Sequence, residues 1–185
     1  FIPSNALGGS NSASILGTRT TEFDNLTVSS GKTLTLYSGT TIIEGDLTNN
    51  GTLNHNNGKI NFSGTSGITQ NIGGSTASMT FSDLEFDNIG GSLNINKPVT
   101  VLDSLLLTNG ILFTPSSSIT MGASGKITGY GDLNYVSGKL IQTYASASSK
   151  IFPVGKNGVY RPLTFAYQTL TGTSATAVEQ FETAL

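Results

Sequence analysis

The sequence predicts an all-β protein: a parallel β-helix, or β-solenoid, of about six coils, followed by a small antiparallel β cap. Composition and a tandem internal repeat carry this prediction. Gly, Thr, Ser and Asn make up nearly half of the 185 residues, and only 11% of the residues are charged. Such a composition favours many short strands joined by tight turns. Leu, Ile, Val and Phe interrupt the polar background at short intervals, which indicates a folded chain with a thin core.

The internal repeat relates residues 26–68 to residues 84–127. Leu26 aligns with Leu84, and an insertion near Gly90-Gly91 then lengthens the offset by one position for the rest of the repeat. Apolar positions and a turn agree between the copies while most polar positions drift, as expected for one stacking unit copied in tandem. Matching positions include Leu34/Leu93, Ile42/Val101, Asn50-Gly51/Asn109-Gly110, Leu53/Leu112 and Ile60/Ile119.

The spacing of apolar positions favours a solenoid over a meander of hairpins. Hairpins would give paired positions at separations that shrink toward each turn. Here the separation between recurring apolar positions stays nearly constant along both copies. It matches the length of one coil of a parallel β-helix, in which equivalent residues of successive coils stack about 4.8 Å apart. We expect right-handed coils, with the stacked pairs Leu34/Leu53, Leu93/Leu112, Ile42/Ile60 and Val101/Ile119.

In chain order, residues 1–20 form an irregular lead-in or N-terminal cap. Residues 21–138 form the solenoid, whose two copies cover 23–70 and 81–128. The segment 63–80 between their cores is Gly-rich, and we expect a looser coil or a protruding loop there.

The last third of the chain changes character. Residues 139–185 contain longer strand-like runs and more aromatic residues, and predict an antiparallel cap or the start of a further domain. A cap covers backbone groups that an open solenoid end would leave unpaired.

Composition also limits the function. The net charge is −2 without a basic patch, which argues against a nucleic-acid or anionic-membrane partner. The absence of cysteine excludes disulfides and thiolate metal sites. No apolar run approaches the ~20 residues of a membrane span. Residues 1–20 show no signal peptide. We expect a piece of a longer chain, whose other domains are partners.

Residues 22–167 resemble a known class of repeat. The runs 23–28, 46–53, 107–112 and 125–129 are similar to the solenoid repeats of large secreted cell-surface proteins of the Bacteroidetes. In those proteins the repeats are often followed by a block that here comprises Phe152, Pro153, Val154, Gly155, Tyr160, Arg161, Pro162 and Leu163. The resemblance implies an extracellular location at the cell surface, export commonly by type IX secretion, and a place in adhesin-like or filament-forming proteins.

Acidic residues are the first candidates for chemistry. A spacing of two places Asp83, Glu85 and Asp87 on one strand face, and Glu44 and Asp46 on another. We interpret both groups as solvated strand positions that discourage sheet-to-sheet association. A calcium site at Asp83, Glu85 and Asp87 is the weaker hypothesis, without a calcium-loop consensus. We expect no cofactor and no catalytic residue.

Two further residues and one surface are candidates for binding. His55 is expected in a solvent-facing turn. Arg161 is expected to stack on Tyr160 or another aromatic ring and to bond backbone carbonyls of the terminal sheet, with anionic-sugar binding as the alternative. Ranks of outward Thr could bind ice, but Thr33 and Thr35 align with Ser92 and Asn94 in the second copy.

Three functional hypotheses follow. The first is a structural and adhesive module, a stiff stalk or interaction surface without catalysis. The second is a carbohydrate-binding or carbohydrate-cleaving β-helix, contacting cell-surface glycans through exposed aromatics. The third is a filament subunit that joins neighbouring copies. The aromatic candidates for the second hypothesis are Tyr37, Tyr130, Tyr135 and Tyr144.

Overall fold

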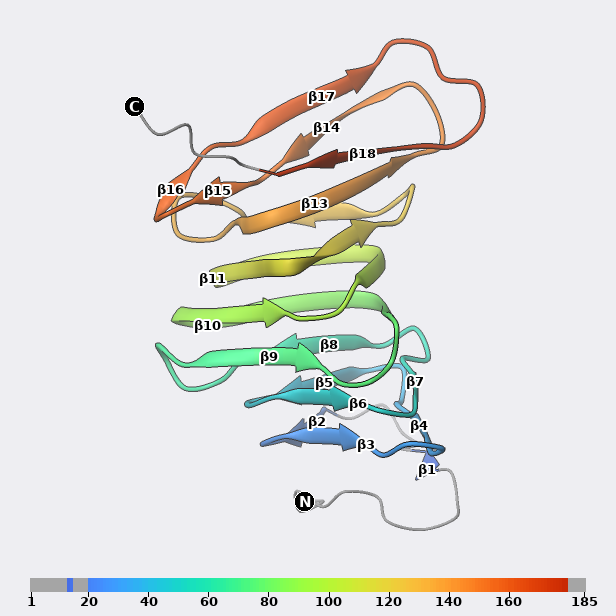
Figure 1. Ribbon diagram of the computed structural model, residues 1–185, viewed down its shortest axis with the longest axis vertical. Coiled ribbons are helices and arrows are strands. Elements are labelled where there is room, and N and C mark those ends of the chain that lie inside the picture. Colours follow the sequence, from blue (N-terminus) through green and yellow to red (C-terminus); the bar gives the residue numbers. More distant parts are fainter. Residues whose placement is uncertain (1–12, 15–19, 180–185) are drawn as a thin grey trace.

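The computed structural model describes residues 13–14 and 20–179. All regular secondary structure in these residues is β-strand, and the strands wind as stacked coils along one long axis (Figure 1). This confirms the predicted solenoid of about six coils, with antiparallel strand pairs near the C-terminus. The described part of the chain holds no helix long and apolar enough to cross a membrane.

Most strands are short because a turn follows each side of a coil. The exceptions, β10, β11 and β13, continue around coil corners. In chain order the strands are β1 (Ala13–Ser14), β2 (Thr21–Phe23), β3 (Leu26–Val28), β4 (Thr33–Thr35), β5 (Thr40–Ile43), β6 (Leu47–Asn49), β7 (Thr52–Asn54), β8 (Lys59–Phe62), β9 (Thr69–Gly73), β10 (Met79–Ile95), β11 (Val99–Met121), β12 (Lys126–Thr128), β13 (Val136–Tyr144), β14 (Ser148–Phe152), β15 (Gly155–Lys156), β16 (Val159–Tyr160), β17 (Leu163–Tyr167) and β18 (Ser174–Val178).

Each coil has three sides, and the strands of a side pair in parallel up the axis. Side A comprises β2, β5, β8, residues 83–86 of β10, residues 104–107 of β11, and β12. Side B comprises β3, β6, β9, residues 92–95 of β10, residues 111–114 of β11, and the start of β13. Side C comprises β1, β4 and β7, then residues 79–81 of β10, both ends of β11, and residues 140–142 of β13.

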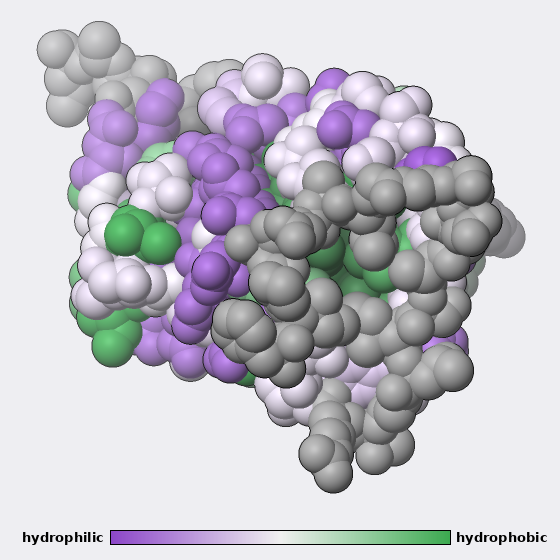
Figure 2. Space-filling model, turned by 90° about the horizontal axis from the view of Figure 1, so that it is seen from below, coloured by the Kyte–Doolittle hydropathy of each residue, from purple (hydrophilic) through white to green (hydrophobic). Residues whose placement is uncertain are grey.

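The core is a set of apolar columns inside the coils. On side A, one column contains Phe23, Ile43, Phe62, Phe86 and Leu107, paired in register from coil to coil. All five side chains are buried. Side chains alternate between the two faces of a strand, so every second residue can join such a column while its neighbours face outward. Seen from the lower end, apolar surface is visible in the middle of the molecule, within a largely polar outline (Figure 2).

Two of the four expected stacks are confirmed. Leu34 pairs with Leu53, and Leu93 pairs with Leu112. The expected stack of Ile42 on Ile60 is wrong by one residue, because Thr41 pairs with Ile60.

The error follows from the two adjacent isoleucines of β5. Ile43 is fully buried and pairs with Phe62, whereas Ile42 faces outward, half-buried, and pairs with Asn61. A shift of one residue moves a side chain to the other face of the strand. Sequence spacing alone did not decide which isoleucine faces the core.

The expected stack of Val101 on Ile119 is also wrong. The amide N–H of Gly122 donates to the Val101 carbonyl at 2.8 Å, which places Val101 level with Met121. This coil therefore runs from Val101 to Met121. It is longer than the predicted coil, which ended at Ile119. Ile119 is still buried, because a shift of two residues keeps a side chain on the same face.

The third coil is longer than its neighbours, as the Gly-rich segment 63–80 suggested. Leu47 pairs with Ile72, a longer step along the chain than the step from Leu26 to Leu47 in the coil below. The additional residues form an irregular corner before β9. Buried Gln70 holds this corner. Its Nε2 donates to the carbonyls of Ile43 (2.9 Å) and Gly45 (3.0 Å), and its Oε1 accepts from Asn88 Nδ2 at 3.3 Å.

The C-terminal strands close the upper end of the solenoid. Residues 140–142 pair in parallel with 119–121, so the ladder continues beyond residue 138, where we expected the solenoid to end. The other edge of β13 pairs antiparallel with β18, and β14 and β17 form an antiparallel pair above it (Figure 1). At the lower end, the expected lead-in 1–20 lies outside the described residues except for Thr20 and β1, which pairs with β4.

Candidate functional site

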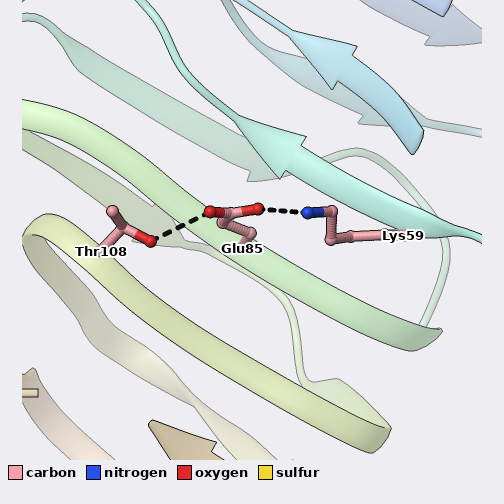
Figure 3. Close-up of polar contacts among 3 residues, drawn as sticks. All are labelled: Lys59, Glu85 and Thr108. Atoms are coloured by element: carbon pink, nitrogen blue, oxygen red, sulfur yellow. Dashed lines mark hydrogen bonds and ion pairs between the residues drawn. The ribbon is translucent and has the colours of Figure 1, made fainter. Parts of the chain in front are cut away.

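The three acidic residues of β10, Asp83, Glu85 and Asp87, alternate along its outward face, and the register with β11 shifts between Phe86 and Asp87. Glu85 is buried and bridges three successive coils of side A (Figure 3). Its Oε2 accepts from Lys59 Nζ at 2.6 Å, and its Oε1 accepts from the Thr108 hydroxyl at 3.0 Å. Asp87 accepts from Asn109 Nδ2 at 2.7 Å. The carboxylates of Glu85 and Asp87 therefore form hydrogen bonds between neighbouring coils.

The weaker calcium hypothesis gains no support from this geometry. Within residues 13–14 and 20–179, no group of three or more His, Cys, Asp or Glu side chains could hold a metal ion. Both oxygens of Glu85 are occupied by donors from neighbouring coils, and calcium prefers six to eight oxygen ligands.

The second acidic pair lies at a corner, which corrects the expected strand face. Glu44 and Asp46 lie between β5 and β6. Asp46 Oδ1 accepts from the backbone N–H (2.8 Å) and the Nδ2 (3.1 Å) of Asn71, whose own Oδ1 accepts from Asn94 Nδ2 at 3.2 Å. Below, the Asp46 N–H donates to Asn25 Oδ1 at 2.7 Å. A polar column thus climbs four coils, and it stabilises the corner as ladders do in other stacked strands.

A lower groove of about 530 Å³ lies between β7 and the start of β10. Its lining is polar and uncharged, with Leu53 and Met79 as the large apolar members. His55 belongs to it, in the turn expected from the sequence, and its Nδ1 accepts from the Asn57 N–H at 3.1 Å. The lining residues are Asn49, Gly51, Thr52, Leu53, Asn54, His55, Asn56, Asn57, Thr76, Ser78, Met79 and Thr80.

An upper groove of about 440 Å³ lies between the coil corner before β12 and strand β14. Lys126, Lys150, Tyr130 and Gln142 line it, together with small and aliphatic residues. Lys150 Nζ donates to the Ala123 carbonyl at 2.8 Å and lies 5.3 Å from the centre of the Tyr144 ring. Partial burial lowers the pKa of Lys150 below its ordinary value.

The block of residues 152–155 and 160–163 connects the cap to the solenoid. Phe152 and Val154 are fully buried, and Val154 bridges to Val136 of the last coil. The hairpin of β15 and β16 follows, and the Arg161 N–H then donates to the Val154 carbonyl at 2.8 Å. Tyr160 packs near Tyr135, with ring centres 6.1 Å apart.

The surroundings of Tyr160 in the cap change the pKa of its hydroxyl. Burial, followed by the nearby Tyr130 and Asp132, raises the pKa of Tyr160. Arg161 itself is exposed. The block therefore joins the two parts of the fold, and its buried members act through packing.

Three of the four tyrosines expected to be exposed are buried. Tyr37, Tyr135 and Tyr144 belong to the interior, and only Tyr130 is accessible in a groove. A phenol ring fills a core position when its hydroxyl finds a partner. Tyr37 donates to the Thr40 carbonyl at 2.6 Å, and Tyr144 donates to the Phe165 carbonyl at 3.2 Å.

Comparison with protein-family models, with curated proteins and with solved structures finds no match to this chain.

Sequence reasoning missed both grooves and the partner of Glu85. Lys59 lies in the coil below Glu85, and Lys126 and Lys150 of the upper groove are likewise distant in the chain. Residues that far apart meet only through coil register, which depends on the number of residues at each corner. The sequence carries no separate signal for them.

The outward threonines pair over short stretches, Thr33 with Thr52 and Thr80 with Thr100, and the lower groove separates the two pairs.

Proposed function

We propose that this chain is a structural and adhesive module, a stiff stalk or interaction surface in an exported cell-surface protein, without catalysis. The observation that carries the proposal is the parallel ladder of side A, which runs through β2, β5, β8, β10, β11 and β12 along the long axis (Figure 1). Bending such a stack would stretch backbone hydrogen bonds on one side and compress side chains on the other.

The side chains support the same role. The carboxylates of Asp46, Glu85 and Asp87 bond to donors from neighbouring coils. Carboxylates that accept hydrogen bonds from neighbouring coils stabilise the stack of coils.

The stiffness can be measured directly along the outer column of side A. This column runs Glu22, Ile42, Asn61, Glu85, Leu106 and Thr128 in register. Five steps of about 4.8 Å place Glu22 and Thr128 roughly 24 Å apart. Both residues are exposed, and the chain has no native cysteine, so E22C and T128C accept spin labels cleanly.

Electron–electron distance measurements on the doubly labelled protein should give one narrow distribution near that separation. A broad or multiple distribution would rule out a stiff stalk. Surface exposure requires its own test, in which antibodies against the chain label intact source cells. Labelling only after lysis would contradict the cell-surface role.

A second candidate, glycan binding, is favoured by the upper groove. Lys126 and Lys150 supply positive charge, Gln142 and Ser149 supply hydrogen-bonding groups, and Tyr130 offers part of an aromatic ring. This combination suits a sugar that carries carboxylate groups. Titration with uronic-acid oligosaccharides tests it: the K126A and Y130A variants should weaken binding, and absence of binding to the unmodified chain would remove this candidate.

A further inference from the structure

The ladder of side C is interrupted at one level. Strands β1, β4 and β7 form a three-stranded sheet of their own that ends at β7. In the next coil, residues 79–81 pair upward with 99–101 and are not paired with β7. Sides A and B stay paired across this level, through β5 with β8 and β6 with β9. The lower groove lies at the interruption.

The turn between β7 and β8 explains the interruption. After β7 the chain makes a turn in which Asn56 and Asn57 have positive φ and the Gly58 N–H donates to the His55 carbonyl. One coil later, β10 passes from side C to side A without a turn. The two coils therefore have different outlines on this side, and their strands do not meet.

The β7 edge offers backbone groups to the groove. The Thr52 N–H donates downward to the Lys32 carbonyl at 2.8 Å, and the Asn54 carbonyl accepts from the Leu36 N–H at 2.9 Å. Successive residues of a strand direct their backbone groups to opposite edges. The N–H and C=O of Leu53, between these two residues, therefore point into the groove.

The upper wall of the groove, formed by the start of β10, also directs backbone groups toward the groove. The Met79 N–H donates upward to the Pro98 carbonyl at 2.9 Å. The same alternation directs the N–H and C=O of exposed Thr80 downward, toward β7. Two strand edges thus face the groove, each with one donor and one acceptor.

The lining restricts what can bind. Among the residues that the structure describes, the lining contains Asn, Thr, Ser, Gly and His but no Asp, Glu, Lys or Arg, so it favours a ligand without net charge. It contains no Phe, Tyr or Trp on which a sugar ring could stack. At the opposite edge of the same sheet, Ala13–Ser14 already adds as an extended strand.

We propose that the lower groove binds an extended, uncharged segment of small residues from a partner polypeptide, which adds as a strand to the free edge of β7. Strand addition supplies backbone hydrogen bonds for affinity, and the small polar lining selects the side chains. This inference does not depend on the stalk role, because it concerns one local edge.

The test uses the whole chain and a capped peptide with the sequence of residues 10–15, Ser-Asn-Ser-Ala-Ser-Ile. The peptide is titrated to millimolar concentration while amide hydrogen exchange is followed by NMR. The amide protons of Leu53 and Thr80 should slow by at least ~10-fold at saturation. The Thr52 amide, already bonded to Lys32, should not change.

Two controls make the test decisive. A peptide methylated on alternate backbone nitrogens should not bind, since strand addition needs its N–H donors. The T80P variant, which removes a donor from the upper wall, should weaken binding while the rest of the spectrum is retained. If T80P does not fold, the methylated peptide decides with the unmodified chain.

Absence of peptide binding, equal binding of the methylated peptide, or protection confined to other residues would overturn the proposal. Protection of Leu53 that grows with protein concentration, without peptide, would overturn the assignment to a separate partner in favour of a second copy.

Discussion

At the residue scale, Glu85 shows how the fold uses its few charges. Only one of its contacts is an ion pair, and the Lys59 side chain in that pair is 39% exposed. The contribution of Glu85 to stability therefore comes from the two hydrogen bonds to its buried carboxylate as much as from charge attraction. The carboxylate stabilises three coils at once, on a protein with a thin core.

Removal of this carboxylate should weaken the stack. E85A should lower the free energy of unfolding by about 1–2 kcal/mol, because Thr108 and Lys59 lose their acceptor. The matched control is D83A, on the same strand face in the same coil, which should change stability by less than ~0.5 kcal/mol. Urea denaturation measures both. Equal losses would mean that Glu85 has no special role.

Two adjacent glycines test a backbone constraint at the end of β9, where the third coil turns from side B toward side C. Gly74 has φ of +124°, and a Cβ there would lie 2.1 Å from the Asn49 carbonyl oxygen, whereas a Cβ on Gly73 would meet nothing within 4 Å. G74A should destabilise by at least ~2 kcal/mol. G73A should be neutral or stabilising by up to ~1 kcal/mol. Thermal unfolding of both variants is the measurement, and similar midpoints would contradict the structure.

At the element scale, strand β5 tests the register that sequence spacing missed. Ile43 belongs to the apolar column of side A and is fully buried, whereas Ile42 faces outward. I43A should cost about 2–5 kcal/mol through lost contacts and a cavity. I42A should cost less than ~1 kcal/mol. The reverse order in urea denaturation would restore the stack of Ile42 on Ile60.

The cap should be sensitive to alkaline pH. Burial, and then the nearby Tyr167, raises the pKa of Tyr144 above its ordinary value of 10.0. The folded state therefore holds the hydroxyl proton more tightly than the unfolded state. This contribution to stability is complete below about pH 10 and is lost as the pH rises through the folded pKa.

The Y144F variant isolates this effect. It should lose less stability than the unmodified chain between about pH 9 and pH 11, since it has no proton to release there. Unfolding midpoints across that range are the measurement. Equal alkaline losses in the two proteins would show that Tyr144 does not contribute.

At the scale of the whole molecule, the interruption on side C makes the coils unequal. Coils of a solenoid contact only their neighbours, so stability is distributed along the axis. At the level of the lower groove, two sides of the coil are paired, whereas β10 and β11 pair on all three sides. The coils below the groove are therefore joined to the coils above it on two sides only.

Native-state hydrogen exchange should reveal this weaker connection. Amide protons bonded within β4 and β5 should exchange at least ~10-fold faster than those bonded between β10 and β11, through local opening of the lower coils. Uniform rates across all strands would instead show that the molecule opens as one unit.

The sequence by itself determined the class of fold and the outline of the stack. Apolar residues at coil-length intervals, with Asn and Gly at the turns, require stacked coils because one coil cannot bury its own side chains. Leu34 over Leu53 and Leu93 over Leu112 follow from that pattern.

Only the tertiary structure decided the register of individual residues and the sites between coils. The number of residues at a corner differs from coil to coil, and a difference of a single residue reverses which side chain faces the core, as at Ile42 and Ile43. The pairing of Lys59 with Glu85, the two grooves and the free edge of β7 all depend on the sum of these corner lengths. That sum is fixed by packing between coils, which local sequence patterns do not contain.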